Sequence, residues 1–511
     1  MKKNQQLVLN ISAGLSALLI SMGIEFVLSP YIVESVGEDA YGFVRLSNNL
    51  VSYFSVLTIA LNSMSSRFIS VSFFQKDLKA ANEYYASTFY ANVGMSVLFL
   101  PVIGFGILNI SQFLRVDERL VLDVQVLMGF MAANFLTGLL CTNLGVSYYI
   151  RNKMYLSSVI SIAGYILRAA IFIIIFSQFE PHICYIGIVA AAVTIFTQVC
   201  NIYYKHRLIP ELTIQKCYFS FEKVKCMCLS GIWNSVTRVG SLLQEGLDLL
   251  ITNLLLSPRE MGILAIAKTI PGAINSMLNT LISMFIPNLT ELYAKGQYEE
   301  MKANVKQSMK IIGMLINIPI ALLIGLGEPL FELWFPTQDP QLLQVLSVLT
   351  IFPWAVMGPA TIIHNIFLIV NKIRMNSLLV CATGLFSVFT VYGLLETTEL
   401  GLFAVAGVST VYSIIRNLCY TVPFGAIYIG CPWYTFFPEI GRSVLGVVAV
   451  SGISAFTNHV FSVSSWKILC FDAVLSGMLG LLFNYFIILD KTDRAYLLKK
   501  MKRQHFTMKR K

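Results

Sequence analysis

Six polar side chains recur at helical spacing within one apolar stretch, residues 229–257. They are separated by four, three, four, three and four positions, so on a continuous α-helix they would lie on one face. They are Asn234, Arg238, Ser241, Glu245, Asp248 and Thr252. Ionisable groups at membrane depth cost at least ~2.5–3.5 kcal/mol each, so they normally face a protein interior or a water-filled cavity. We therefore expect this face to line a path or a polar core.

Basic side chains at membrane depth point to an anionic substrate. Arg238 and Glu245 are two helical turns apart, about 10 Å, which is too far for a direct ion pair. Guanidinium groups bind phosphates in a bidentate manner, so a cavity rich in arginine suits a phosphorylated ligand. The candidate substrate-binding residues are Arg238, Arg67, Arg168, Lys268, Arg416, Asn234 and Asn275.

Buried carboxylates are candidates for coupling transport to a cation. Glu25, Glu245 and Asp248 could each take up a proton or a sodium ion and drive a switch between two states. A static ion pair between adjacent helices is the alternative for two of them. Glu25 and Arg45 are nearly equidistant from one predicted turn, and Asp248 and Lys268 are nearly equidistant from another.

Other polar residues have simpler interpretations. Serine and asparagine stripes such as Ser52, Ser55 and Asn62 often join packed membrane helices by hydrogen bonds. His364 is isolated from other metal-ligating side chains within its predicted span, which is typical of a hydrogen-bonded core residue rather than a ligand. No nucleophile–base pair or metal cluster is evident, so we expect neither an enzyme nor a bound cofactor.

The composition predicts a membrane protein that crosses the bilayer many times. Of the 511 residues, 56% are hydrophobic and 13% are charged, and the mean hydropathy is +0.71. A soluble protein carries roughly 25% charged residues. The apolar runs have the length of helices, not of barrel strands. The net charge of +10 needs no nucleic acid to explain it, because basic cytoplasmic loops account for it.

Windows of ~20 residues predict about 14 transmembrane helices. The expected limits are 7–32, 42–72, 84–108, 122–148, 156–178, 183–204, 229–257, 262–290, 307–327, 342–370, 377–396, 401–428, 442–460 and 467–489.

The distribution of basic residues predicts that both termini are cytoplasmic. With the N-terminus inside, about 27 Lys and Arg lie in inner segments, and orientation follows this bias. The outer loops hold five, namely Arg45, Arg115, Arg119, Arg259 and Lys467. The basic tail, 490–511, is expected to lie on anionic lipid.

The chain contains an internal repeat with an offset of about 220 residues. Glycine 42 matches Gly262 (262 − 42 = 220), and Asn152 matches Asn371 (371 − 152 = 219). Six helices per half is an even number, so the two halves have the same orientation and a substrate would bind between them. We expect lobes at 1–204 and 229–428, a cytoplasmic loop at 205–228 between them, and two additional helices at 442–489.

This arrangement resembles the multidrug/oligosaccharidyl-lipid/polysaccharide exporter superfamily, and within it the bacterial polysaccharide (O-antigen-type) flippases. The local marks are loose: Gly37-x-x-x-Tyr41-Gly42, then Ser65-Ser66-Arg67 before a basic inner loop, and small-residue runs at 186–191 and 400–407. The resemblance implies two six-helix lobes around a central cavity with alternating access. It also places Arg67 at the family's arginine that ends the second helix.

The resemblance implies a flippase in the bacterial cytoplasmic membrane. Its substrate would be an undecaprenyl-diphosphate-linked oligosaccharide, a repeat unit of a surface polysaccharide such as lipopolysaccharide O-antigen, and glycan polymerase machinery would be a candidate partner. A cation-coupled multidrug exporter of the same superfamily is the first alternative, although an acidic cavity would suit it better. A membrane glycan polymerase or ligase is a third possibility, but it should present a large outer loop with catalytic residues, and the sequence predicts none.

Overall fold

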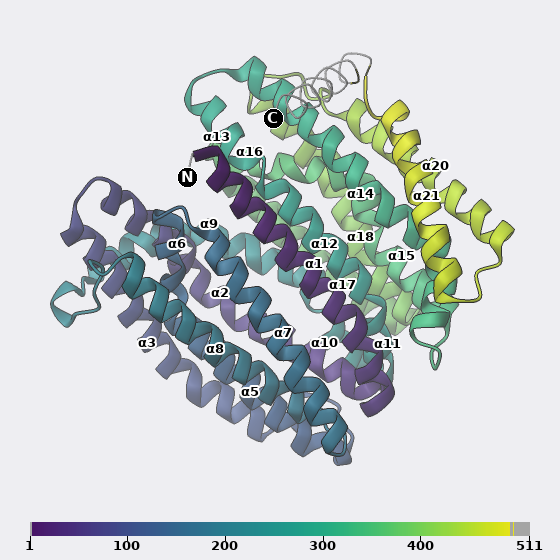
Figure 1. Cartoon of the computed structure of the whole chain (residues 1–511), viewed down its shortest axis with the longest axis horizontal. Helices are drawn as coiled ribbons and strands as arrows, with labels where there is room; N and C mark the ends of the chain where they lie inside the picture. Colours follow the sequence, from purple (N-terminus) through teal and green to yellow (C-terminus); the bar gives the residue numbers. More distant parts are fainter. Residues whose placement is uncertain (1–2, 491–493, 495–511) are drawn as a thin grey trace, which may run out of the picture. The chain divides into compact units, whose positions relative to one another are not determined.

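The computed structural model describes residues 3–490 and Arg494, and these residues fold into helices joined by short connections (Figure 1). Within this part of the chain, 13 helices are long and apolar enough to cross a membrane. The prediction of an all-α membrane protein with about 14 spans is thereby confirmed. The predicted span without a counterpart among these 13 helices is 229–257, which is interrupted by a π-helical segment. Most of the predicted basic tail, 490–511, lies outside the described residues.

The helices group into two compact units. The first unit comprises Met1–Ala265 together with Val380–Leu385, and the second comprises Ile266–Leu379 and Phe386–Lys511. The helix α17 (Ile373–Thr397) therefore contributes to both units. The predicted division into lobes at the loop 205–228 stays a prediction.

The first unit contains the predicted spans one to seven. Its helices are α1 (Lys3–Val36), α2 (Glu38–Phe74), α3 (Leu78–Leu108), α4 (Ile110–Phe113), α5 (Val121–Leu140), α6 (Val146–Ile150), α7 (Met154–Gln178), α8 (Cys184–Leu208), α9 (Phe221–Ser241), α10 (Asp248–Leu255) and most of α11 (Pro258–Ala267). Short helical turns are η1 (Glu118–Leu120), η2 (Thr142–Gly145), η3 (Lys216–Tyr218) and the π-helical η4 (Leu242–Gly246).

The second unit contains the remaining spans. Its helices are α12 (Thr269–Ser283), α13 (Ile286–Ala294), α14 (Tyr298–Trp334), α15 (Pro340–Met357), α16 (His364–Ile369), α18 (Leu402–Arg416), α19 (Val422–Ile427), α20 (Phe437–Phe461) and α21 (Trp466–Ile487), with most of α17. The turns are η5 (Gly358–Ile363) and the π-helical η6 (Asn417–Thr421).

Small and polar residues hold the helices of each unit together. In the second unit α14 packs against α20 and α21 (Figure 1). Asn317 of α14 donates to the Ser443 carbonyl at 3.0 Å and accepts from the Ser443 hydroxyl at 3.0 Å. Both side chains are buried. Buried amide and hydroxyl groups of this kind replace the hydrophobic driving force that apolar helices lack in lipid.

In the first unit a similar network joins α2, α3 and the α5–η2 region. Ser65 donates to Asn143 at 2.7 Å and shares a hydrogen bond with Thr88 at 3.0 Å. Asn92 donates to Asn62 at 3.1 Å and to the Leu139 carbonyl at 2.9 Å. This contact supports the packing interpretation of Asn62. By contrast, Ser52 and Ser55 bond only to carbonyls of their own helix among the described residues.

Local structure recurs at the positions that the repeat equates. Asn152 and Asn371 both adopt positive φ, 51° and 55°, a conformation that asparagine tolerates better than most residues. Gln125 and Gln344, 219 apart (344 − 125), each donate to a carbonyl of a preceding long helix. The fourth span of each half is interrupted by a 3₁₀ turn, η2 in one and η5 in the other. These matches support the repeat at the level of backbone conformation.

Candidate functional site

The helix α9 carries the first three of the six polar residues, Asn234, Arg238 and Ser241, and it packs closely against α2. A Cβ atom at Gly231 would overlap the backbone carbonyl of Ala60, so only glycine permits this approach. Two polar contacts cross the same interface. Asn234 donates to the Ser63 hydroxyl at 3.1 Å, and Ser235 donates to the Val56 carbonyl at 3.4 Å. The interface therefore places the first predicted site residue, Asn234, against α2.

The expected continuous α-helix over 229–257 is wrong, because a π-helical segment, Leu242–Gly246, interrupts it. The wider π turn frees backbone groups from the regular α-helical bonding pattern. The Gly246 carbonyl instead accepts from the Tyr53 hydroxyl at 2.6 Å and from the Asn49 amide at 3.3 Å, both on α2. Side chains of α2 thus stabilise the interruption.

The interruption divides the six polar residues of the predicted span into two groups. Asn234, Arg238 and Ser241 precede the π segment and keep their common face on α9. Beyond it the register is shifted, so the 4-3-4 spacing no longer implies a shared face. Glu245 is exposed, whereas Asp248 and Thr252 are buried. The structure therefore does not place all six residues on one stripe.

Glu25 is paired within the first unit. Its carboxylate lies 2.5 Å from the Arg45 guanidinium. Arg45 also donates to the Tyr41 hydroxyl through Nε at 3.0 Å and Nη2 at 2.8 Å. This geometry is that of the static ion pair that the hairpin argument predicts as the alternative to ion coupling. In this conformation a cation at Glu25 would have to compete with Arg45.

Three arginines of the first unit that were predicted to bind substrate have no such partner among the described residues. Within the part of the chain that the structure describes, Arg67, Arg168 and Arg238 form no ion pair and no hydrogen bond. Arg67 and Arg238 are exposed, and Arg168 is half-buried. An unpaired guanidinium on a membrane helix is stable only where water, a headgroup or an anionic ligand satisfies it.

The other predicted site residues belong to the second unit. Lys268 lies between α11 and α12 and is half-buried, and Arg416 is the last residue of α18, directly before the π-helical η6. Asn275 on α12 accepts a hydrogen bond from Asn279 at 3.2 Å. Single π turns occur frequently at functional sites. Among the described residues the π segments are η4 and η6; Arg238 lies one helical turn before η4, and Arg416 directly precedes η6.

Glycines at equivalent repeat positions bring α2 and α11 together. The Cβ that Gly42 lacks would lie 3.0 Å from the Gly262 nitrogen, and a Cβ at Gly262 would overlap the Glu38 carbonyl. Arg259 extends the contact by donating to Glu38 at 2.8 Å. The sequence shows the matching glycines, but their close approach to each other is visible only in the fold.

Sequence reasoning did not find two acidic sites in the second unit. Asp472 on α21 is fully buried, and it accepts from Ser476 at 3.0 Å. Asp490, just beyond α21, pairs with Lys310 at 2.6 Å and with Arg442 at 2.9 Å. The signal for Asp472 was present, as a single acid within the predicted span 467–489. The partners of Asp490 are 180 and 48 residues away (490 − 310 and 490 − 442), and no sequence spacing connects them.

Comparison with known proteins places the fold. No family model matches the chain. A curated relative, an uncharacterized membrane protein EpsK of Bacillus subtilis (strain 168), is 27% identical over 499 residues, which cover 97% of this chain and 98% of the relative.

Solved structures share the architecture at low identity. The lipid II flippase MurJ in an inward closed conformation has a TM-score of 0.63 at 12% identity, covering 93% of this chain and 98% of the flippase. An inward-facing multidrug resistance MATE family transporter of the MOP superfamily has a TM-score of 0.62 at 14% identity, covering 83% and 98%. The chain therefore has the fold of MOP-superfamily transporters.

Proposed function

We propose that this protein is a transporter that moves an undecaprenyl-diphosphate-linked oligosaccharide from the cytoplasmic to the outer leaflet by alternating access. The observation that carries the proposal is the set of arginines without carboxylate partners in the first unit, Arg67, Arg168 and Arg238. Such guanidinium groups can bind a diphosphate, whereas a cationic drug would be repelled by them.

The extent of the structural likeness also supports a flippase. The likeness to MurJ covers 93% of this chain, and the likeness to the MATE transporter covers 83%. MurJ is a lipid II flippase, and for this chain we infer a diphosphate-linked glycan from the arginines.

A cation-coupled multidrug exporter is the second candidate. The MATE likeness supports it, because the TM-score of 0.62 is nearly that of the MurJ match, 0.63. A buried acid on α10, Asp248, is the type of group that such an exporter uses to bind a cation.

Deletion of the gene separates these two functions. For a flippase, complete lipid-linked repeat units should accumulate on the cytoplasmic leaflet, and surface polysaccharide should be lost. For a drug exporter, surface polysaccharide should be normal and sensitivity to cationic dyes should rise. Single units already outside but not joined would instead indicate a polymerase.

Substitution of Arg238 tests the residue at the centre of the proposal. We expect Arg238→Ala to abolish transport at an unchanged membrane level, because the exposed side chain makes no ion pair or hydrogen bond with the described residues. Arg238→Lys should restore transport only in part, since lysine lacks the planar fork of donors. A control is Arg119→Ala, in the short turn η1, where the side chain is 90% exposed. Normal glycan export by Arg238→Ala would contradict the proposal.

A further inference from the structure

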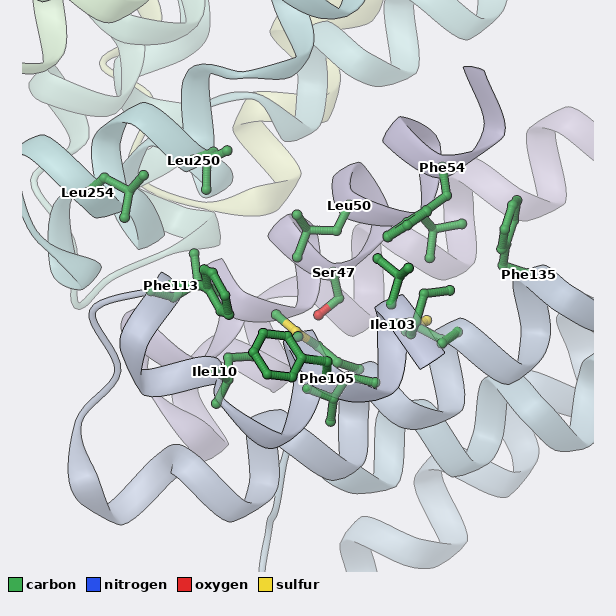
Figure 2. A pocket seen from close by; sticks show the side chains of 18 residues that line it. Ser47, Leu50, Phe54, Ile103, Phe105, Ile110, Phe113, Phe135, Leu250 and Leu254 are labelled. Atoms are coloured by element: carbon green, nitrogen blue, oxygen red, sulfur yellow. The ribbon is translucent and has the colours of Figure 1, made fainter. Parts of the chain in front are cut away.

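An apolar groove of about 460 Å³ lies in the first unit between α2, α3, α4, α5 and α10 (Figure 2). Of the described residues that line it, Ser47 alone has a side-chain nitrogen or oxygen. The Ser47 hydroxyl donates to the Phe43 carbonyl of its own helix at 2.7 Å. The groove therefore offers a ligand hydrocarbon contact and no free side-chain hydrogen bond.

The groove has an aromatic floor and an open mouth. At the floor Phe54 of α2 and Phe135 of α5 lie with ring centroids 6.4 Å apart, and Phe99 packs against both. At the mouth Phe105 and Phe113 are 6.2 Å apart and 61% and 52% exposed. Figure 2 shows these two pairs at opposite ends, with Ser47 between them. The lining of α2 runs from Ser47 to Phe54, about 10 Å at 1.5 Å per residue.

Water is a poor occupant of this groove. A buried water needs two to four polar partners, and the lining supplies none beyond the satisfied Ser47 hydroxyl. A sugar would lose its hydrogen bonds in the same way. Phe105 belongs to α3, a helix long and apolar enough to cross a membrane, so we expect lipid hydrocarbon around its exposed ring. A chain of methylene groups can fill such a groove without leaving a polar group unsatisfied.

The groove is separate from the polar candidate site. The residues of α2 that line it are 47, 50, 51 and 54, at helical spacing on one face. Asn49 and Tyr53, which bind the Gly246 carbonyl, do not line the groove, and neither do Asn48 and Ser52. The groove is therefore lined by a different face of α2 from the one that binds the π segment.

We propose that this groove binds an acyl chain of a membrane phospholipid, with the chain end against the floor made by Phe54 and Phe135. Under the predicted orientation the groove lies in the outer half of the membrane, so the lipid belongs to the outer leaflet. The proposal does not depend on which substrate the protein transports.

Photolabelling of the purified full-length protein tests the site. The protein would be reconstituted in vesicles that contain phosphatidylglycerol with a diazirine at the end of one acyl chain. After irradiation, mass spectrometry should find adducts on the peptides that contain Phe54 and Phe135. Absence of adducts from both peptides would overturn the proposal.

Two glycines of α3 provide matched variants. Gly106 lines the groove and Gly104 does not, and a Cβ at either position would meet no atom within 4 Å. Gly106→Leu and Gly106→Phe should fill the groove and lower the labelling of the Phe54 and Phe135 peptides. The larger phenylalanine should lower it more than leucine does. For phenylalanine we expect a loss of about tenfold, equivalent to about 1.4 kcal/mol of affinity. Gly104→Phe should label as the wild type does.

Two further results would overturn the proposal. Floor labelling of a monodisperse Gly106→Phe protein at the wild-type level would show that the acyl chain lies elsewhere. Floor labelling by a photoreactive polyprenyl phosphate, without labelling by the phospholipid, would assign the groove to a different lipid. Neither measurement involves glycan transport, so each outcome is independent of the proposed function.

Discussion

At the scale of single residues, the pair Glu25–Arg45 decides between a structural and a coupling role. The two groups are 2.5 Å apart and are 40% and 29% exposed. We expect Glu25→Gln to lower the stability of the protein by about 1.5–3 kcal/mol, the range for a hydrogen bond to a charged group. The dependence of transport on pH or sodium should not change, because the pair is static.

A double-mutant cycle with Arg45→Gln checks this assignment. Thermal unfolding in detergent should show that the second substitution costs less in the Glu25→Gln background than in the wild type, since the two residues share one interaction. Additive losses, or an altered ion dependence in Glu25→Gln, would instead support coupling through Glu25.

Residue types and helix geometry anticipated one contact of the fold and missed another for a physical reason. Helix geometry predicted the Glu25–Arg45 pair, which the structure contains, whereas the substrate-binding role of Arg238 and Arg168 stays a prediction. The pairing of Asp490 with Lys310 depends on two helices far apart in the sequence. No local pattern reports such a contact, so only the folded chain reveals it.

At the scale of elements, the π segment Leu242–Gly246 depends on α2. The Gly246 carbonyl accepts from Tyr53 at 2.6 Å. Tyr53→Phe removes this donor and leaves the amide of Asn49, so we expect a loss of about 1 kcal/mol in stability. Transport should also fall, because the segment sets the register between Arg238 and Asp248.

Thermal unfolding and a transport assay measure both effects. Tyr31→Phe is a suitable control, because its hydroxyl makes no hydrogen bond among the described residues and its ring stays packed against Phe172. Equal behaviour of the two variants would show that the Tyr53 hydroxyl does not support the π segment.

Spacing alone predicted the span 229–257 but not its interruption. A π turn adds one residue to a turn, and the sequence spacing of four and three fits a regular α-helix equally well. The interruption is stabilised from outside the helix, by Tyr53 and Asn49. The periodicity of one segment cannot report a hydrogen bond made by another.

The ion pairs of Asp490 join the end of α21 to α14 and α20. Hydrogen bonds from Lys310 and then Arg442 lower the pKa of Asp490 below its ordinary value. A carboxylate with a lowered pKa in the folded state stabilises the fold above the unfolded pKa, about 3.9. This contribution is lost as the pH falls through the folded pKa.

We therefore expect Asp490→Asn to unfold at a lower temperature than the wild type at pH 7. The difference should shrink as the pH falls from about 4, the unfolded pKa, through the lowered pKa of the folded carboxylate, because the wild-type group then becomes protonated. Thermal unfolding of both proteins across this pH range tests whether the difference in unfolding temperature shrinks as the pH falls. Glu399→Gln is a control, since Glu399 is exposed and forms no ion pair among the described residues. A constant difference at all pH values would contradict the ion-pair explanation.

At the scale of the whole molecule, two sets of ion pairs join residues that the predicted topology places on the same side of the membrane. Lys310, Arg442 and Asp490, all predicted to be cytoplasmic, pair with one another. Arg259 pairs with Glu38 on the predicted outer side. A helical membrane fold could be predicted from hydropathy because each span must satisfy its backbone within itself. The packing of the spans could not, because it depends on glycines whose neighbours are distant in sequence.

Accessibility of two loops tests the topology directly. Cys217 is exposed in the predicted cytoplasmic loop 205–228, and Ser462 follows α20 in a predicted outer loop. In a background without the other cysteines, a membrane-impermeant maleimide should label Ser462→Cys in intact protoplasts. It should label Cys217 only after permeabilisation. The reverse pattern would show that the chain has the opposite orientation in the membrane. The groove of Figure 2 would then lie in the cytoplasmic leaflet. The direction of glycan transport would have to be argued anew, because Arg238 would approach its anion from the opposite side.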